Sequence, residues 1–337
     1  MSATVNATGG GPLLFLTDSD VGELHSWKDA IEALRAAYAA PISDNMVPPR
    51  SMARGDGFWL RGLSAISPGG GHMGCKLIAA SMRARRASYL ISLFDQQTME
   101  LAALIDGNQI TAIRTAATAA VAVDALAPRR PLRVAMIGSG FEARSQLNAL
   151  HAARDIASVA VFSPTPASRQ RFADDFQRLL GIEVVAADTP QQAIEGADVI
   201  VCAARSRDES PVLRGEWLRP GATVVSIGST LPEQREVDVD VIRRAGLIVA
   251  DMVDEVAHDT GDLIAAAREG VAFGDKLHSL SDLIGGRLPA RAPGDIAVYK
   301  SVGSALQDVV TAEMLLKRAR ATGVGTLLPV SIAPVQK

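Results

Sequence analysis

The sequence predicts an α/β protein of two domains, one of them built around a parallel sheet. The chain has 337 residues, and domains commonly hold roughly 100–200 residues. Its second half alternates short apolar runs with helical patterns, which is typical of a parallel sheet. Its first section instead contains several short strands in succession. We therefore expect a strand-rich α+β domain followed by a doubly wound α/β domain.

Residues 1–127 carry the pattern of the α+β domain. Thr17 and Asp18 form a helix start signal, and apolar residues recur at helical spacing over residues 27–38. Residues 47–50 must be extended, because proline disfavours the helical conformation of the residue before it. Apolar runs predict strands at residues 13–16, 58–60, 73–78, 88–94 and 101–105.

An alanine-rich stretch at residues 111–126 has no helix breaker and predicts a long helix. Prolines at 128 and 131 end it, and we place the domain boundary there. Residues 128–303 form the second domain, and an amphipathic helix at 304–321 joins residues 304–337 to the first domain. In the second domain we expect strands at 133–137, 158–162, 183–186, 198–203, 223–227 and 247–250, and helices at 143–152, 167–180 and 190–195.

Composition argues against several classes of protein. The formal net charge of −3 gives no electrostatic case for a nucleic-acid partner, and no apolar stretch reaches the length of about 20 residues that a membrane helix needs. The first 12 residues lack the basic and apolar regions of a signal peptide and are expected to be a disordered tail. Cys75 and Cys202 form no paired motif, so we expect two buried thiols, no structural zinc and a cytoplasmic location.

A glycine-rich turn follows the first strand of the second domain and opens its first helix. The residues fit the pattern G-x-G-x-x-A in this context. The first glycine permits a tight turn, the second lets the backbone approach a pyrophosphate, and the alanine keeps the helix close to its strand. The helix N-terminus favours the phosphates. The turn predicts a Rossmann dinucleotide-binding domain whose cofactor contacts are Gly138, Ser139, Gly140, Phe141, Glu142 and Ala143.

The end of the second Rossmann strand indicates which nicotinamide cofactor is bound. A carboxylate at this point would bind the ribose 2′-hydroxyl of NAD, but no carboxylate is present. Ser163, Thr165 and Arg169 stand there instead and suit a 2′-phosphate. This favours NADP and leaves NAD open, the alternative being that Arg169 is an ordinary solvated helix residue.

Three basic residues of the first section stand in unusual settings. Arg50 follows two prolines, Lys76 lies inside an apolar strand, and Arg114 falls in the first turn of the expected long helix, where a cation opposes the helix dipole. A cation in an apolar strand and a cation at a helix N-terminus both need an anionic partner. A bound carboxylate would serve both.

The chain resembles the ornithine cyclodeaminase/mu-crystallin family over nearly its whole length from about residue 13. The stretch 111–117 is the most specific part of the resemblance, because a generic helix does not demand it. The motifs that carry the resemblance lie at residues 47–50, 74–77, 107–117, 138–140, 228–232 and 300–303.

The resemblance implies a homodimer, with the first section and the C-terminal helix forming the dimerisation and substrate domain. It implies that Arg50, Lys76 and Arg114 bind a substrate carboxylate. The shared motifs also place Ser229 and Gly303 among the expected cofactor contacts.

Thr230 marks a departure from the family pattern. Ornithine cyclodeaminases carry an aspartate in a Gly-Gly-Asp-x-Pro segment, and this chain has Gly228-Ser229-Thr230-Leu231-Pro232. A neutral hydroxyl neither pairs with a distal ammonium nor acts as a general base at neutral pH. This favours the reductase branch, with Lys76 and Thr230 as the candidate catalytic residues.

Three functions follow as hypotheses. The first is an NAD(P)-dependent imine reductase or amino-acid dehydrogenase, an oxidoreductase of amino acid metabolism, with Lys76 or water as the proton donor. The second is an ornithine cyclodeaminase with tightly bound NAD. The third is a non-enzymatic, mu-crystallin-like binding protein for a small ligand. No metal is expected, because the acidic residues around His258 fit a solvated helix face better than a metal site.

Overall fold

The computed structural model describes residues 13–206, 208–289, 291–292, 294–330, 332 and 334–336. The expected disordered tail at residues 1–12 lies outside the described residues. The chain divides into two compact units. Unit 1 takes in residues up to Ser26, Pro41–Thr111 and Ala305 onward, and unit 2 takes in Trp27–Ala40 and Ala112–Ser304.

Unit 1 is built on one mostly antiparallel sheet with the strand order β15-β1-β6-β5-β4-β3-β2. β1 runs parallel to β6, and the other neighbours are antiparallel. The strands expected at residues 58–60 and 73–78 are longer than predicted, because their polar ends still pair in the ladder. The bounds are β1 (Leu14–Leu16), β2 (Ser51–Gly55), β3 (Phe58–Ile66), β4 (His72–Ser81), β5 (Arg86–Asp95), β6 (Leu101–Asp106) and β15 (Thr326–Leu327).

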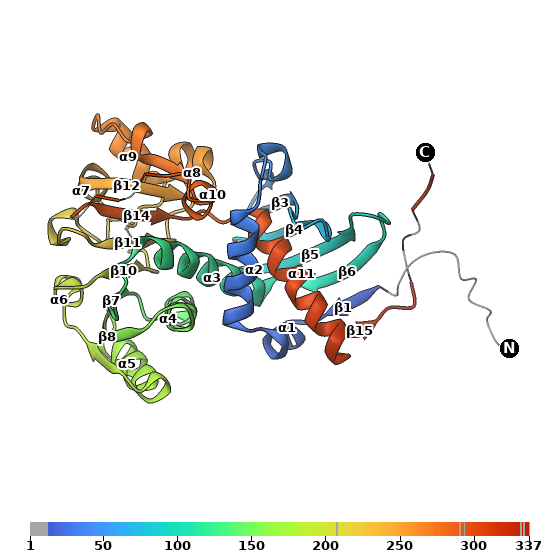
Figure 1. Ribbon diagram of the computed structural model, residues 1–337, viewed down its shortest axis with the longest axis horizontal. Helices are drawn as coiled ribbons and strands as arrows, with labels where there is room; N and C mark the ends of the chain where they lie inside the picture. The colour runs from blue at the N-terminus through green and yellow to red at the C-terminus, as the bar shows by residue number, and fades with distance from the viewer. Residues whose placement is uncertain are drawn as a thin grey trace. The chain divides into compact units, whose positions relative to one another are not determined.

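Helix α11 (Ala305–Thr322) covers one face of this sheet, over β3, β4 and β5 (Figure 1). The first half of α11 is buried on nearly every side, including its polar residues Gln307 and Asp308. The expectation of an ordinary amphipathic helix is therefore wrong for this half. The shorter α1 (Asp18–Leu24) also contacts α11 and begins with a capping box at Thr17.

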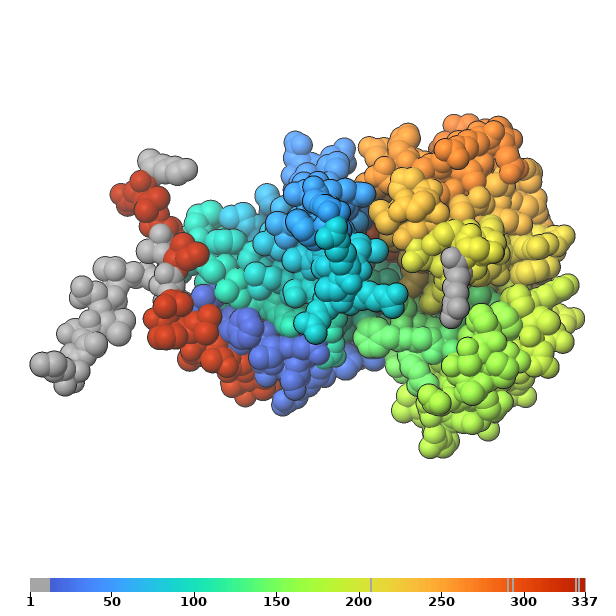
Figure 2. Space-filling view, turned by 180° about the vertical axis from the view of Figure 1, so that it is seen from behind, coloured from blue at the N-terminus to red at the C-terminus, as the bar shows by residue number. Residues whose placement is uncertain are grey.

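The opposite face of the same sheet is apolar and exposed. Side chains alternate along each strand, so Leu63, Lys76 and Ile91, which pair across three strands, are buried together. Their neighbours in sequence point the other way. Figure 2 views this other face, where residues of β2–β5, in blue to cyan, form the surface. Cys75 belongs to it and is only half-buried, so just one of the two expected buried thiols, Cys202, is buried.

Unit 2 is built on an eight-stranded parallel sheet with the order β13-β12-β14-β11-β10-β7-β8-β9 (Figure 1). From the middle of the sheet, β7, β8 and β9 follow one another toward one edge. β10 and β11 follow one another toward the other edge, which is the Rossmann order. The strands are β7 (Leu132–Ile137), β8 (Ile156–Phe162), β9 (Glu183–Ala186), β10 (Val199–Cys202), β11 (Thr223–Ser226), β12 (Ala245–Ala250), β13 (Leu277–Ser279) and β14 (Ile296–Lys300).

Helices lie between these strands in the chain. The expected helices are present within a few residues of their predicted ends, and shorter ones, α7 to α10, were not predicted. The bounds are α2 (Trp27–Ala39), α3 (Asn108–Leu126), α4 (Phe141–Ala153), α5 (Pro166–Leu180), α6 (Pro190–Ile194), α7 (Val239–Arg244), α8 (Val253–Asp259), α9 (Gly261–Arg268) and α10 (Leu280–Ile284), with short 3₁₀ turns at Asp44–Met46, Gly215–Trp217 and Gly274–Lys276.

Two features differ from the sequence-based division. The long helix α3 begins at Asn108, three residues earlier than expected, so Arg114 lies in the second turn rather than the first. The helix dipole acts mainly within the first turn, so it gives no reason for Arg114 to need an anionic partner. The compact units also divide near residue 111 rather than at 127, and residues 27–40 of the first section belong to unit 2, where α2 packs on α4 and α10.

Among the described residues, no helix is long and apolar enough to cross a membrane.

Candidate functional site

Lys76 lies on the covered face of unit 1, in the middle of β4. Its side chain is 1% exposed. The ammonium donates hydrogen bonds to Oγ1 of Thr111 at 2.7 Å and to Oδ1 of Asp308 at 2.9 Å. It also lies 5.6 Å from the centre of the Tyr89 ring. The protein thus holds a buried lysine in a fixed position.

Asp308 was not predicted as a partner of Lys76, and its position changes the interpretation of that lysine. The expectation that this cation needs a bound anion is wrong, because Asp308, itself 1% exposed, supplies the counter-charge from α11. The signal in the sequence was an aspartate within an apolar helical segment, which should have suggested a buried ion pair. The proposal that Lys76 contacts a substrate does not depend on that argument.

The other two cations lie in different units. Arg50 is half-buried and stands immediately before β2 in unit 1. Arg114 is half-buried on α3, in the part of that helix that belongs to unit 2. Its guanidinium packs against the backbone of Gly303, which follows β14.

The glycine turn after β7 has the geometry of a dinucleotide-binding loop. Gly138 has φ +118°, a conformation that side chains disfavour, and an added Cβ would lie 2.8 Å from the carbonyl oxygen of Ala203. Gly140 caps α4, and an added Cβ there would meet no atom within 4 Å. Ala143 is fully buried against the sheet. The turn therefore leaves open space at a helix N-terminus, which fits the phosphates of a dinucleotide.

Ser163, Thr165 and Arg169 lie where the second Rossmann strand ends. Oγ of Ser139 donates to Oγ of Ser163 at 2.9 Å, which ties this strand end to the glycine turn. Arg169 donates to the carbonyl of Ser163 at 3.2 Å and forms an ion pair of 2.6 Å with Asp188, whose side chain is 83% exposed. Arg169 is therefore held in place, rather than being a free surface residue.

Ser229 and Thr230 lie in a compact turn after β11. Oγ of Ser229 donates to the carbonyl of Gln234 at 2.7 Å. The Thr230 backbone donates to Oε1 of Gln234 at 2.9 Å, and its hydroxyl approaches the same oxygen at 3.3 Å. This turn therefore presents a neutral hydroxyl at the position where cyclodeaminases carry an aspartate.

All the expected cofactor contacts follow the carboxyl ends of parallel strands of one sheet. The glycine turn follows β7, Ser163 follows β8, Ser229 follows β11 and Gly303 follows β14. In such a sheet these ends lie along one edge, where ligands bind. Gly138 packs on the segment after β10, at the point where the strand order reverses.

Comparison with known families decides the identity of this fold. The profile of the ornithine cyclodeaminase/mu-crystallin family matches residues 14–323. The chain belongs to this family.

Individual relatives agree with the family assignment. The chain is 32% identical over 238 residues to a Δ1-pyrroline-2-carboxylate reductase of Bacillus cereus, which covers 70% of this chain and 72% of the relative. It is 31% identical over 225 residues to mouse ketimine reductase mu-crystallin, 67% of each chain. The structure of Thermococcus litoralis Δ1-pyrroline-2-carboxylate reductase with NADH and L-proline has a TM-score of 0.85 at 28% identity, covering 94% of this chain and all of that one. The predicted α/β class with a Rossmann sheet is confirmed.

A second buried group of charges lies behind the Thr230 turn in this family member. Oε2 of Glu236 accepts hydrogen bonds from Oγ of Ser226 at 2.6 Å and from the Gly228 backbone at 2.9 Å. Lys300 donates to Ser226 at 2.8 Å and pairs with Asp262 at 3.0 Å. Burial raises the pKa of Glu236 to about 7, although Lys300 and these hydrogen bonds act to lower it.

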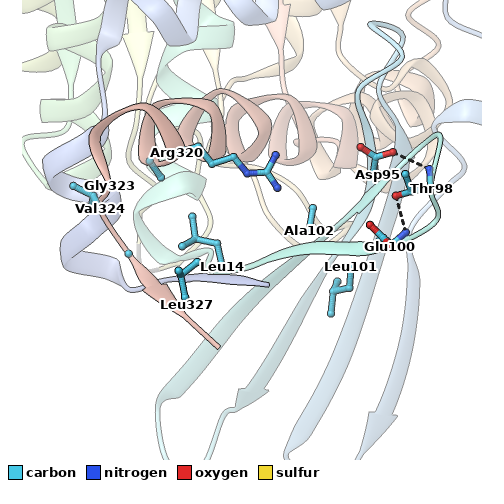
Figure 3. A pocket seen from close by; sticks show the side chains of 12 residues that line it. Leu14, Asp95, Thr98, Glu100, Leu101, Ala102, Arg320, Gly323, Val324 and Leu327 are labelled. Atoms are coloured by element: carbon cyan, nitrogen blue, oxygen red, sulfur yellow. Dashed lines mark hydrogen bonds between the residues drawn. The ribbon is translucent and has the colours of Figure 1, made fainter. Parts of the chain in front are cut away.

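A cavity of about 590 Å³ in unit 1 lies away from the predicted site residues. Figure 3 shows Arg320 on one side and Asp95 and Glu100 on the other. Arg320 is in the last turn of α11, whereas Asp308 is in its first, a separation of about 18 Å along the helix at roughly 1.5 Å per residue. The cavity is therefore distinct from the Lys76 pair. No group of three potential metal ligands is found among the described residues.

Replacing Asp308 tests the buried ion pair. Asp308→Asn leaves the Lys76 cation buried without its counter-charge and should lower the free energy of unfolding by about 3–5 kcal/mol, measured by urea denaturation. The control is Asp56→Asn, whose pair with Arg83 is exposed on both sides (72% and 88%) and should cost less than about 1 kcal/mol. Equal losses in the two variants would contradict a dominant role for burial.

Glu236 should make stability depend on pH. Its pKa is higher in the folded chain than the ordinary value of 4.5, so folding favours the protonated form, and its contribution is lost as pH rises from about 4.5 to about 7. Glu236→Gln should therefore become more stable relative to wild type across this range and then level off, as read from thermal midpoints at pH 5, 6, 7 and 8. Glu269→Gln, at an exposed ion pair, is the control. A difference from wild type that does not change with pH would count against the shifted pKa.

Proposed function

We propose that this chain is an NAD(P)H-dependent reductase of small α-imino acids, of the ketimine reductase type. The observation that carries this proposal is the neutral Thr230 turn combined with a Rossmann loop of dinucleotide-binding geometry. A cyclodeaminase would need a carboxylate at residue 230 to serve the substrate's distal amino group. Relatives named as pyrroline-2-carboxylate reductase and ketimine reductase support the same branch.

The cofactor would be held by the glycine turn, by Ser163, Thr165 and Arg169, and by the backbone at Ser229 and Gly303. Bound NAD(P)H supplies the hydride for reduction of the carbon–nitrogen double bond. The position of Arg169 near the end of the second Rossmann strand supports a preference for NADPH. The Thermococcus relative was solved with NADH, so both cofactors belong in the test.

The substrate carboxylate would be bound by Arg50, Lys76 and Arg114. Three cations fix the acid group and so orient the imine carbon, which contributes mainly by positioning. Lys76, held by Asp308, would contact the carboxylate and is the candidate donor of a proton to the imine nitrogen. Thr230, oriented by Gln234, would contact the substrate near that nitrogen as a hydrogen-bonding hydroxyl.

The purified chain should oxidise NADH or NADPH when supplied with Δ1-pyrroline-2-carboxylate or Δ1-piperideine-2-carboxylate. The readout is the loss of absorbance at the nicotinamide band. Lys76→Ala should reduce kcat/KM by at least about a hundredfold, since it removes both a carboxylate contact and a proton donor.

Ornithine provides the opposing arm of this experiment. Ammonia release from ornithine without net cofactor oxidation would establish a cyclodeaminase instead. Tight ligand binding with no turnover of any imine, and no effect of Lys76→Ala beyond weaker binding, would establish a binding protein.

We further propose that the chain is a homodimer joined through the exposed face of the unit 1 sheet, opposite α11. The large apolar side chains on this face include Phe58, Leu60, Leu77 and Leu90, which are 61, 47, 40 and 38% exposed. An exposed apolar surface of this kind usually marks an interaction site. Its pairing with an identical face would form an isologous two-fold interface.

A charge placed on this face should disrupt the dimer. Leu77→Glu introduces an unpaired carboxylate at the proposed interface and should shift the mass in light scattering from dimer toward monomer. Leu179→Glu, at an equally apolar but 66% exposed position on α5, should leave the mass unchanged. A monomeric wild type, or a Leu77→Glu variant that remains dimeric, would refute this interface.

A further inference from the structure

The guanidinium of Arg114 occupies the space that a side chain at residue 303 would need. Gly303 has φ +79°, and a Cβ built on it would lie 2.7 Å from Nη2 and 2.8 Å from Cζ of Arg114. Such distances are too short for carbon in contact with nitrogen or carbon. A side chain at residue 303 would therefore displace the Arg114 guanidinium, in addition to straining the backbone at this positive φ.

Asp251 fixes the segment on which this guanidinium rests. It follows β12 directly, and β12 pairs with β14, so its side chain faces the residues just after β14. Its Oδ2 accepts hydrogen bonds from Oγ of Ser301 at 2.6 Å and from the Gly303 backbone at 2.8 Å. Its Oδ1 accepts a third from the Val302 backbone at 3.0 Å. One carboxylate thus binds three consecutive residues.

The same carboxylate and the Arg114 cation act on one buried phenol. Burial raises the pKa of Tyr299 well above its usual value, Asp251 raises it further, and the Arg114 cation acts in the opposite direction. Both charged groups therefore lie close enough to the end of β14 to act on Tyr299.

We propose that Asp251 and Gly303 are positioning residues that aim Arg114 at the substrate carboxylate. Gly303 leaves room for the guanidinium, and Asp251 holds the supporting backbone in the conformation that provides this room. Neither residue needs to touch the substrate. The inference rests on the proposed function, since it assigns Arg114 to the carboxylate of an α-imino acid.

A general effect of glycine replacement is the main alternative. Alanine at φ +79° is strained wherever it stands, so a loss of stability alone would not support the proposal. Gly181 is a matched control, because it has φ +66° at the end of α5 and an added Cβ there would meet nothing within 4 Å. Gly181→Ala imposes a similar backbone strain without the steric contact.

The test is a double-mutant cycle between residues 303 and 114. The probe is pyrrole-2-carboxylate, a flat carboxylate that cannot be reduced by hydride, and its Kd for the chain loaded with NADH is measured by calorimetry. Gly303→Ala should weaken binding by about ten- to a hundredfold, because a displaced guanidinium loses its charge-assisted hydrogen bonds to the carboxylate. In the Arg114→Ala background the same change should weaken binding by no more than about twofold, since the group on which it acts is gone.

Two further variants complete the experiment. Asp251→Asn keeps the size of the side chain but removes its charge, and it should raise KM for Δ1-pyrroline-2-carboxylate more than it lowers kcat. Gly181→Ala should leave both Kd and KM unchanged, even if it lowers the thermal midpoint as much as Gly303→Ala does.

The outcomes separate this inference from the proposed function. If the losses from Gly303→Ala and Arg114→Ala multiply, or if wild type does not bind pyrrole-2-carboxylate, the positioning role is overturned. If wild type binds the probe with the expected coupling but reduces no imine, the proposed function fails while the positioning role stands.

Discussion

The parallel alignment of the strands in unit 2 is the constraint on which the rest of the structure depends. Because every strand of this sheet runs in the same direction, segments from residue 138 to residue 303 lie after the strands' carboxyl ends. Each segment would contribute one part of the proposed site: a phosphate loop, a ribose contact, a neutral hydroxyl and a support for Arg114. Side chains far apart in the chain can therefore act on one ligand without any long ordered loop.

Buried charges contact several of these segments and the strands that carry them. Lys76 and Asp308 form one fully buried pair, and Lys300, Asp262 and Glu236 form another group. A buried ion pair stabilises a fold little compared with an apolar pair of equal size, so stability does not explain them well. They do define directions, since Glu236 and Asp262 each bind two or more donors and Asp308 accepts a hydrogen bond from Lys76. Asp308 holds the side chain of Lys76, and Glu236 holds the backbone of Gly228 close to Thr230.

Much of the fold could be predicted from the sequence, because its signals are local. The glycine turn stands between an apolar strand and a helix, and the strands of the first section alternate or form apolar runs. β14 was missed as a strand although residues 296–299 are apolar, and its place between β11 and β12, out of chain order, is known only from the structure. Asp308 was missed because its signal is not local. Its partner is 232 residues away, and no local pattern reports such a pairing.

The helix starts illustrate the same limit on a smaller scale. α3 begins at Asn108, three residues before the expected start, so Arg114 lies outside the first turn. The expected unfavourable interaction of Arg114 with the helix dipole is therefore absent. The position of Arg114 is better explained by the contact with Gly303, which follows from the tertiary structure. Sequence motifs selected these residues as candidates, whereas the structural reason for the position of each one requires its neighbours in space.

The ion pair between Arg169 and Asp188 has a consequence for how the chain discriminates between dinucleotides. Asp188 is almost fully solvated, while the guanidinium it binds is 11% exposed. In the proposed NADPH complex, the 2′-phosphate and the Asp188 carboxylate would therefore compete for one cation. Such competition weakens as dissolved ions screen the outer charge, so the preference between the two coenzymes would vary with ionic strength. Replacement of Asp188 alone would then be enough to shift the preference between the two coenzymes.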